Sequence, residues 1–218
     1  MKERIIGRPK GADDMLNFTI QAVQCRKSGP QRSDIMSLLL EAKDAETGEP
    51  LNEMELISEM IIQLFAGTDT TSVTLSWTLY LLMNHSDKME SLFQELKRVY
   101  PQLADVDTMK YSDVQSLPYL NAVLDESMRL YPVAGNFLPR QVPENGAEIS
   151  SIFVPEGVMV GCSIYAMHRD PSVFSEPDSF LPERWLFNPE DRDAEAKVRL
   201  MHASLRPFSE GAALLAHC

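Results

Sequence analysis

An acid and an alcohol stand side by side within a long apolar stretch of this chain. Asp69 and Thr70 follow Gly67 in residues 66–71. A glycine costs a helix interior about 1 kcal/mol relative to alanine, and a carboxylate among apolar turns costs more unless it has partners. Gly67 lets a ligand approach the backbone, and Thr70 lies on the same face, so the acid and the alcohol can relay protons into a closed pocket. A helix that bends itself through threonine hydroxyls explains the segment equally well, and the residues alone leave both interpretations open.

Three further polar elements follow along the chain. Glu126 and Arg129 are three residues apart and share one face of a predicted helix, where such a pair is usually a surface ion pair. Arg184 lies in a Pro-Glu-Arg-Trp segment of a proline-rich region. Phe208 lies in an Arg-Pro-Phe-Ser-Glu-Gly segment that must bend tightly at its glycine. Taken alone, each element is explained by an ordinary ion pair or turn.

Several well-known sites are missing from the sequence. There is no phosphate-binding loop, dinucleotide-binding glycine motif, nucleophile elbow or zincin motif. The histidines show no metal-ligand spacing, and the three cysteines are widely separated without a C-x-x-C pattern. We therefore expect surface or packing roles for the histidines, no protein metal ligand, no disulfide framework and a reducing compartment. The residues concerned are His85, His168, His202, His217, Cys25, Cys162 and Cys218.

The element that must position Asp69 is the longest helical pattern in the chain, over about residues 52–84. Between Met60 and Met83 its only charged residue is Asp69, and a helix over this stretch would cover roughly 36 Å, enough to span a membrane. Too many threonine and serine residues lie near its middle for a membrane span. We therefore expect a helix buried through the centre of a soluble domain.

Helical patterns dominate the first part of the chain and short strands the second. A helix is predicted to end before the Ser-Gly-Pro break at residues 28–30, a short one to follow an Asp34 N-cap, and another to run from a Ser86 N-cap to Pro101. Residues 111–118 form a predicted connector, and residues 119–130 a further helix. Strands are predicted at 149–154 and 158–164 around a Pro-Glu-Gly turn. This order predicts an α+β fold, predominantly α, rather than repeating βαβ units.

Composition narrows the class of protein. The chain has 218 residues, with 20 Lys and Arg against 32 Asp and Glu, a net charge of −12. With 44% hydrophobic and 24% charged residues, it matches one globular domain and not a disordered chain. Because no basic stripe appears, we expect no nucleic-acid partner. The polar start lacks the apolar core of a signal peptide or membrane anchor, so nothing in this chain indicates its localisation.

Together and in this order, the four polar elements resemble the cytochrome P-450 superfamily of haem-thiolate monooxygenases. Residues 66–71 resemble the A/G-G-x-D/E-T-T/S motif of its oxygen-activating helix. Glu126 and Arg129 match its E-x-x-R helix, and Arg184 matches the arginine of its P-E-R-F/W segment. The resemblance covers about residues 35–211 and implies the C-terminal portion of the cytochrome P-450 fold, incomplete at both ends.

The resemblance also implies roles for individual residues. Asp69 and Thr70 would be catalytic and deliver protons during oxygen activation. Haem (iron protoporphyrin) would be the cofactor, and Arg140 would pair with one of its propionates. The implied cofactor-binding residues are Gly67, Arg140 and Phe208, and the implied buried ion-pair network that holds the haem-binding core is formed by Glu126, Arg129 and Arg184.

The sequence departs from the family at the axial ligand. The family signature reads F-x-x-G-x-R-x-C-x-G, and counting from Phe208 places Ala213, Leu215 and His217 at its arginine, cysteine and last glycine. Leucine cannot ligate iron, whereas the family's chemistry depends on an axial thiolate. Cys218 lies three residues beyond the ligand position, so the ligand role is not transferred to it. We therefore expect this chain as written to lack the family's activity.

The resemblance implies oxygen insertion into an apolar organic substrate, with electrons from a reductase. The competing hypothesis is a non-catalytic truncated helical protein, or a partner-binding module, without haem. Complete relatives are often membrane-anchored and face the cytoplasm. We expect a single partial domain with a helical part (35–131) and a strand and loop part (132–211), flanked by a poorly assigned segment (1–34) and a divergent tail (212–218).

Overall fold

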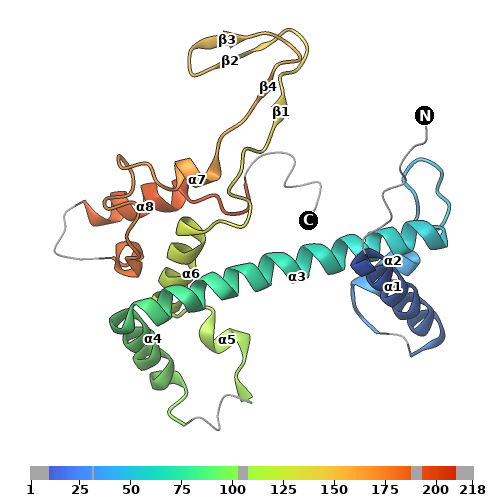
Figure 1. Ribbon diagram of the computed structural model, residues 1–218, viewed down its shortest axis with the longest axis horizontal. Helices are drawn as coiled ribbons and strands as arrows, with labels where there is room; N and C mark the ends of the chain where they lie inside the picture. The colour runs from blue at the N-terminus through green and yellow to red at the C-terminus, as the bar shows by residue number, and fades with distance from the viewer. Residues whose placement is uncertain (1–9, 31, 103–107, 188–192, 210–218) are drawn as a thin grey trace. The chain divides into compact units, whose positions relative to one another are not determined.

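The computed structural model describes residues 10–30, 32–102, 108–187 and 193–209 (Figure 1). The chain divides into two compact units, Met1–Thr71 and Ser72–Cys218. The α-helices of the described residues are α1 (Lys10–Ser28), α2 (Ile35–Glu41), α3 (Glu53–Asn84), α4 (Ser86–Val99), α5 (Tyr111–Val114), α6 (Pro118–Leu130), α7 (Ile164–Met167) and α8 (Ala194–Ser204). Residues Pro182–Trp185 form the 3-10 helix η2. The strands are β1 (Arg140–Gln141), β2 (Ala147–Ile149), β3 (Ile152–Val154) and β4 (Met159–Val160).

The first unit is built from α1, α2 and the start of α3. The predicted Asp34 N-cap of α2 is confirmed, because its carboxylate accepts a hydrogen bond from the Ser37 backbone N–H at 3.0 Å. Asn52 and Glu55 form a capping box at the start of α3, in which each side chain accepts from the other residue's backbone N–H. These caps fix the ends of helices that share a small apolar core, made of Val23, Met36, Leu56 and Ile57.

The long helix α3 forms as predicted, but the expectation that it is buried along its length is wrong. Its middle is exposed, and apolar side chains such as Phe65 (59% exposed) and Leu75 (54%) face solvent. Burial is concentrated near its ends. Leu56 belongs to the apolar core of the first unit, and Leu82 belongs to an apolar cluster of the second unit. The apolar pattern predicted the helix correctly. Burial of its middle also requires another segment to pack against it, and the described residues do not supply such a segment. No helix among the described residues is long and apolar enough to cross a membrane.

The second unit packs the end of α3, α4, α6, η2 and α8 around two apolar clusters. The predicted helix over 119–130 is confirmed as α6, and its start is fixed from another helix: the Glu95 carboxylate of α4 accepts from the backbone N–H groups of Tyr119 (2.9 Å) and Leu120 (2.8 Å). The first cluster contains Leu81, Leu82, Leu92, Val123, Leu130 and Phe180, and the second contains Ala122, Phe174, Trp185 and Met201. The second cluster links α6 to η2 and α8.

Two local predictions in this unit are corrected. The N-cap of α4 is His85 and not Ser86, and no side chain caps the helix; the His85 ring bonds instead to the Leu81 carbonyl at 2.8 Å. Only His85 separates the end of α3 at Asn84 from the start of α4, so His85 occupies the N-cap position and Ser86 is the first helical residue. The connector at residues 111–118 contains a helical turn, α5.

The strands pair differently from the prediction. β2 and β3 form an antiparallel hairpin, and β1 pairs with β4 (Figure 1). Residues 149–154 are thus not one strand, because the chain reverses at Ser150 and Ser151, whose φ angles are 50° and 61°. A predominantly helical α+β fold is nevertheless confirmed.

Candidate functional site

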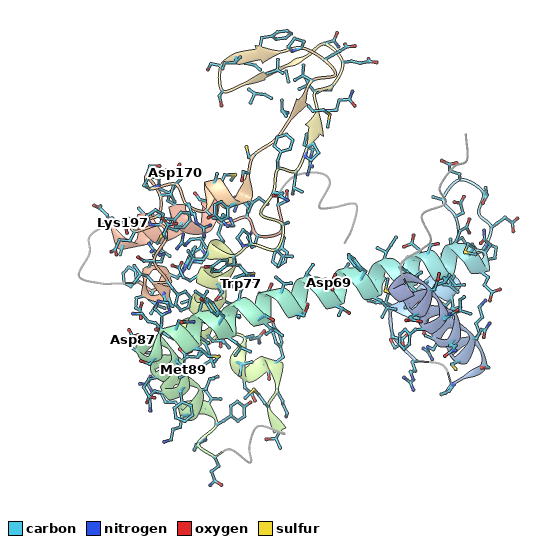
Figure 2. The ribbon with its side chains drawn as sticks, in the orientation of Figure 1. Asp69, Trp77, Asp87, Met89, Asp170 and Lys197 are labelled. Carbon is cyan, nitrogen blue, oxygen red and sulfur yellow. The ribbon has the colours of Figure 1, made fainter. Side chains whose placement is uncertain are left out.

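Asp69 lies in the middle of α3 (Figure 2). Thr70 is the next residue of the helix, and both residues are exposed. The Thr70 hydroxyl donates to the Ala66 carbonyl at 2.7 Å, one turn back along the helix. A Cβ built on Gly67 has no neighbouring atom within 4 Å, so the backbone at this glycine is open. The structure thus shows the threonine-to-backbone bond of the helix-bending interpretation, and the open backbone that a ligand would need.

The carboxylate of Glu126 is the centre of a buried hydrogen-bond network. It is fully buried and accepts from Arg129 at both oxygens, at 2.8 and 2.9 Å. Arg184 Nε (3.1 Å) and the Leu181 backbone N–H (3.0 Å) donate to Oε1, and the Trp185 indole (2.9 Å) donates to Oε2. The structure therefore brings together the three residues predicted as a network, from α6 and η2.

Both arginines of this network also donate to backbone carbonyls. One carboxylate cannot neutralise two guanidinium charges, and the carbonyl dipoles around them supply the remaining negative partial charge. Arg129 also lies over the Phe174 ring, 5.1 Å from its centroid. The accepting carbonyls are those of His168, Pro177 and Ser179 for Arg129, and Ser175 and Glu176 for Arg184. The network consequently fixes the loop between α7 and η2 against α6.

Three members of this region were not found by sequence reasoning. Leu181 takes part through its backbone, for which no sequence signal exists. Trp185 carries a weak signal, since a buried indole needs an acceptor for its N–H and the tryptophan directly follows Arg184. His168 is fully buried, and its ring Nε2 accepts from the Arg206 backbone N–H at 2.8 Å. Burial lowers the pKa of His168 from 6.5 to about 4.

The residues predicted to contact a cofactor lie on exposed parts of the structure. Gly67 is in α3, and Arg140 is in β1, where its guanidinium donates to the Pro139 carbonyl at 3.1 Å. Phe208 follows α8 and is 73% exposed.

The donor set does not fit an axially ligated haem. Leu215, in register with the family's cysteine, has no ligating atom; it lies outside the described residues, as do Ala213, His217 and Cys218. Cys25 and Cys162 are exposed free thiols far from that register. Within the described ranges, no group of three His, Cys, Asp or Glu residues could hold a metal ion.

Comparison with known proteins points to one family. The family model of cytochrome P-450 matches residues 3–212. The cytochrome P-450 monooxygenase BOT1 of Botryotinia fuckeliana is 40% identical over 162 residues, which is 74% of this chain and 31% of that protein. Cytochrome P-450 3A7 of Homo sapiens is 35% identical over 180 residues, covering 78% of this chain and 35% of that protein.

Solved structures give the same relationship. The haem domain of cytochrome P-450DA superposes with a TM-score of 0.70, and the retinoic acid-bound cyanobacterial CYP120A1 with a TM-score of 0.73, each at 28% sequence identity. Each match covers 91% of this chain, but only 42% and 43% of the respective structures. The chain thus spans about a third of its curated relatives' length and corresponds to part of their fold.

Proposed function

Because the chain belongs to the cytochrome P-450 family, we propose that it carries part of the scaffold of a haem-dependent monooxygenase that inserts oxygen into an apolar organic substrate. The observation that supports this most strongly is the buried network in which Glu126 meets Arg129 and Arg184. A buried ion-paired network of this kind determines geometry more surely than stability. The proposed role of the network is to hold the core on which a cofactor site is built.

Within that proposal, Asp69 and Thr70 are the proton-relaying pair. In the structure the Thr70 hydroxyl proton points to the Ala66 carbonyl. A relay requires this hydroxyl to rotate, so that Oγ1 accepts a proton from one side and donates its own to the other. Asp69, the adjacent residue, would supply protons from solvent.

Haem would supply redox and oxygen chemistry in a complete member of this family, but the residues of this chain do not fit it. Leu215 stands where an axial thiolate is required. We therefore assign no oxygen-insertion activity to this chain as written. Arg140 and Phe208, with the open backbone at Gly67, are the proposed cofactor contacts of the scaffold, and a reductase its proposed electron donor.

A non-catalytic, partner-binding role is the second candidate. The exposed apolar residues in the middle of α3 favour it, because several large apolar side chains exposed on one helix can be covered by a partner. This role needs neither haem nor the relay. The two candidates therefore differ in what happens when the missing ligand is provided.

A chimera with the fungal relative distinguishes the candidates. In it, the 162 matched residues of the Botryotinia protein are replaced by those of this chain, and the rest of that protein supplies the remaining fold. If the scaffold is a monooxygenase scaffold, the chimera binds haem and turns over substrate. A chimera that folds but takes up no haem would favour the partner-binding role.

The chimera also tests the relay. Thr70→Ala is expected to leave haem uptake unchanged while product formed per electron pair consumed falls, because the hydroxyl that passes the proton is gone. Thr71→Ala is the matched control and is expected to keep the coupling. Equal product yield in both variants would remove the relay role from Thr70.

A further inference from the structure

His168 lies where three helices of the second unit meet. It directly follows α7, and its side chain is fully buried. Its backbone carbonyl accepts from Arg129 of α6 at 2.8 Å, and its ring Nε2 accepts from the backbone N–H of Arg206, just beyond α8, at 2.8 Å. One residue therefore contacts both the Glu126 network and the segment that leads to Phe208.

The Arg206 bond determines which ring nitrogen carries the proton. A backbone amide can only donate, so Nε2 must be unprotonated and the neutral ring must carry its proton on Nδ1. Nδ1 is buried and makes no hydrogen bond of ordinary geometry among the described residues, although backbone groups of Arg129 and Met128 lie near enough to raise the pKa of the ring. A buried donor without a partner is destabilising. Packing alone would be served better by an apolar side chain, so the acceptor at Nε2 is what explains a histidine here.

The surroundings keep this ring neutral. Burial is the largest cause of the low pKa of about 4. Hydrogen bonding to the backbone of Arg129 and Met128 raises the pKa, whereas the positive charges of Arg129 and Arg169 lower it. The Arg169 guanidinium itself is bonded to Asp178 (3.1 Å) and to the Leu130 carbonyl (2.7 Å). At neutral pH the ring consequently remains an acceptor for the Arg206 amide.

We propose that His168 is a positioning residue that ties residues 205–209 to the Glu126–Arg129 pair. The ring acts as an acceptor that fixes the direction of the chain as it leaves α8. This assignment rests on the proposed function only in that residues 205–209 lead to the proposed cofactor contact Phe208. The tie itself is a property of the chain without any cofactor.

Hydrogen exchange at the Arg206 amide tests the tie in the full chain. His168→Leu removes the acceptor and is expected to speed exchange of this amide by about tenfold or more, the change produced by losing one ordinary net hydrogen bond. His168→Gln places a carbonyl oxygen at a similar reach and is expected to restore the protection. The Leu181 amide, bonded to Glu126, is the internal control and should be unaffected. Unchanged protection of Arg206 in His168→Leu would overturn the proposal.

A second measurement covers the case in which His168→Leu does not fold. Nitrogen NMR of the unsubstituted chain at pH 7 reports the tautomer of this ring directly. The proposal requires a protonated Nδ1 and an unprotonated Nε2. A proton on Nε2, or a doubly protonated ring, would overturn it.

Neither measurement uses haem, so its outcome is distinguishable from that of the proposed function. In the chimera, His168→Leu is expected to retain less haem than His168→Gln. A chimera without haem would count against the monooxygenase scaffold and leave the exchange result intact. If the Arg206 amide loses protection in His168→Leu but the two variants retain equal haem in the chimera, the hydrogen bond from Arg206 to His168 only orders residues 205–209. The proposed link between His168 and the cofactor contact Phe208 would then be overturned.

Discussion

At Glu126 a single negatively charged carboxylate is paired with two buried, positively charged guanidinium groups, those of Arg129 and Arg184. Glu126→Gln keeps the size of the side chain but removes its charge, leaving the charges of Arg129 and Arg184 uncompensated. We expect the free energy of unfolding to fall by about 3–5 kcal/mol, measured by urea denaturation. Glu195→Gln, in the exposed pair with Arg199, is the control and is expected to change little. Equal effects of the two substitutions would contradict the buried network.

His168 gives the stability of the chain a pH dependence. Its folded pKa of about 4 lies below its ordinary value of 6.5. As the pH falls between these values, the unfolded chain takes up a proton that the folded chain does not, so stability is lost on acidification. The shift corresponds to roughly 3 kcal/mol between pH 7 and pH 4. The stability difference between the unsubstituted chain and His168→Gln should change by this amount, and parallel pH profiles would show that His168 does not contribute.

The residues of the site differ in how far the sequence could predict them. Glu126 and Arg129 share a helix face, and Arg184 stands in a short recognisable segment. Their spacing alone predicts only an ordinary ion pair and a turn, and it is the resemblance to the family that implies one buried network. Trp185 and Leu181 reach Glu126 from 59 and 55 residues away. Their contacts, like that of His168 with Arg206, arise from tertiary packing and leave no periodic signal along the chain.

For helices and strands, the sequence predicts the features that depend on interactions between residues close together in the chain. Asp34 caps its helix through a bond three residues away, so its role could be identified from the sequence. The hairpin reversal at Ser150 and Ser151 was missed because neither residue is typical of a turn with positive φ. The start of α6 is satisfied by Glu95 of α4, a long-range cap that sequence reasoning did not detect.

This long-range cap predicts a measurable coupling between α4 and α6. Glu95→Gln weakens the acceptor for the Tyr119 and Leu120 amides, and we expect it to lower the free energy of unfolding by about 1 kcal/mol, as the loss of a helix cap does. Glu90→Gln, on the same helix and bonded only locally to Gln94, is the control. If the Glu90 and Glu95 variants were equally stable, the capping role of Glu95 would be wrong.

At the scale of the whole molecule, α3 shows the limit of reading burial from composition. Its apolar pattern correctly predicted a helix from near residue 52 to 84, but its middle is exposed. A stretch with many apolar residues indicates that its surface needs to be covered, but it does not indicate which segment covers it.

The chain spans about a third of the length of its curated relatives. The division of the chain into parts at residues 34, 131 and 211 stays a prediction.

This chain corresponds to part of the cytochrome P-450 fold, and its sequence has no thiolate in register. The most direct test is the carbon monoxide difference spectrum of the purified chain after incubation with haem and reduction. We expect no haem-thiolate band from the chain as written, and a band from the chimera if the rest of the fungal protein supplies an axial cysteine. A stable haem-thiolate band from the chain itself, abolished by Cys218→Ser, would overturn this expectation and place the ligand at Cys218.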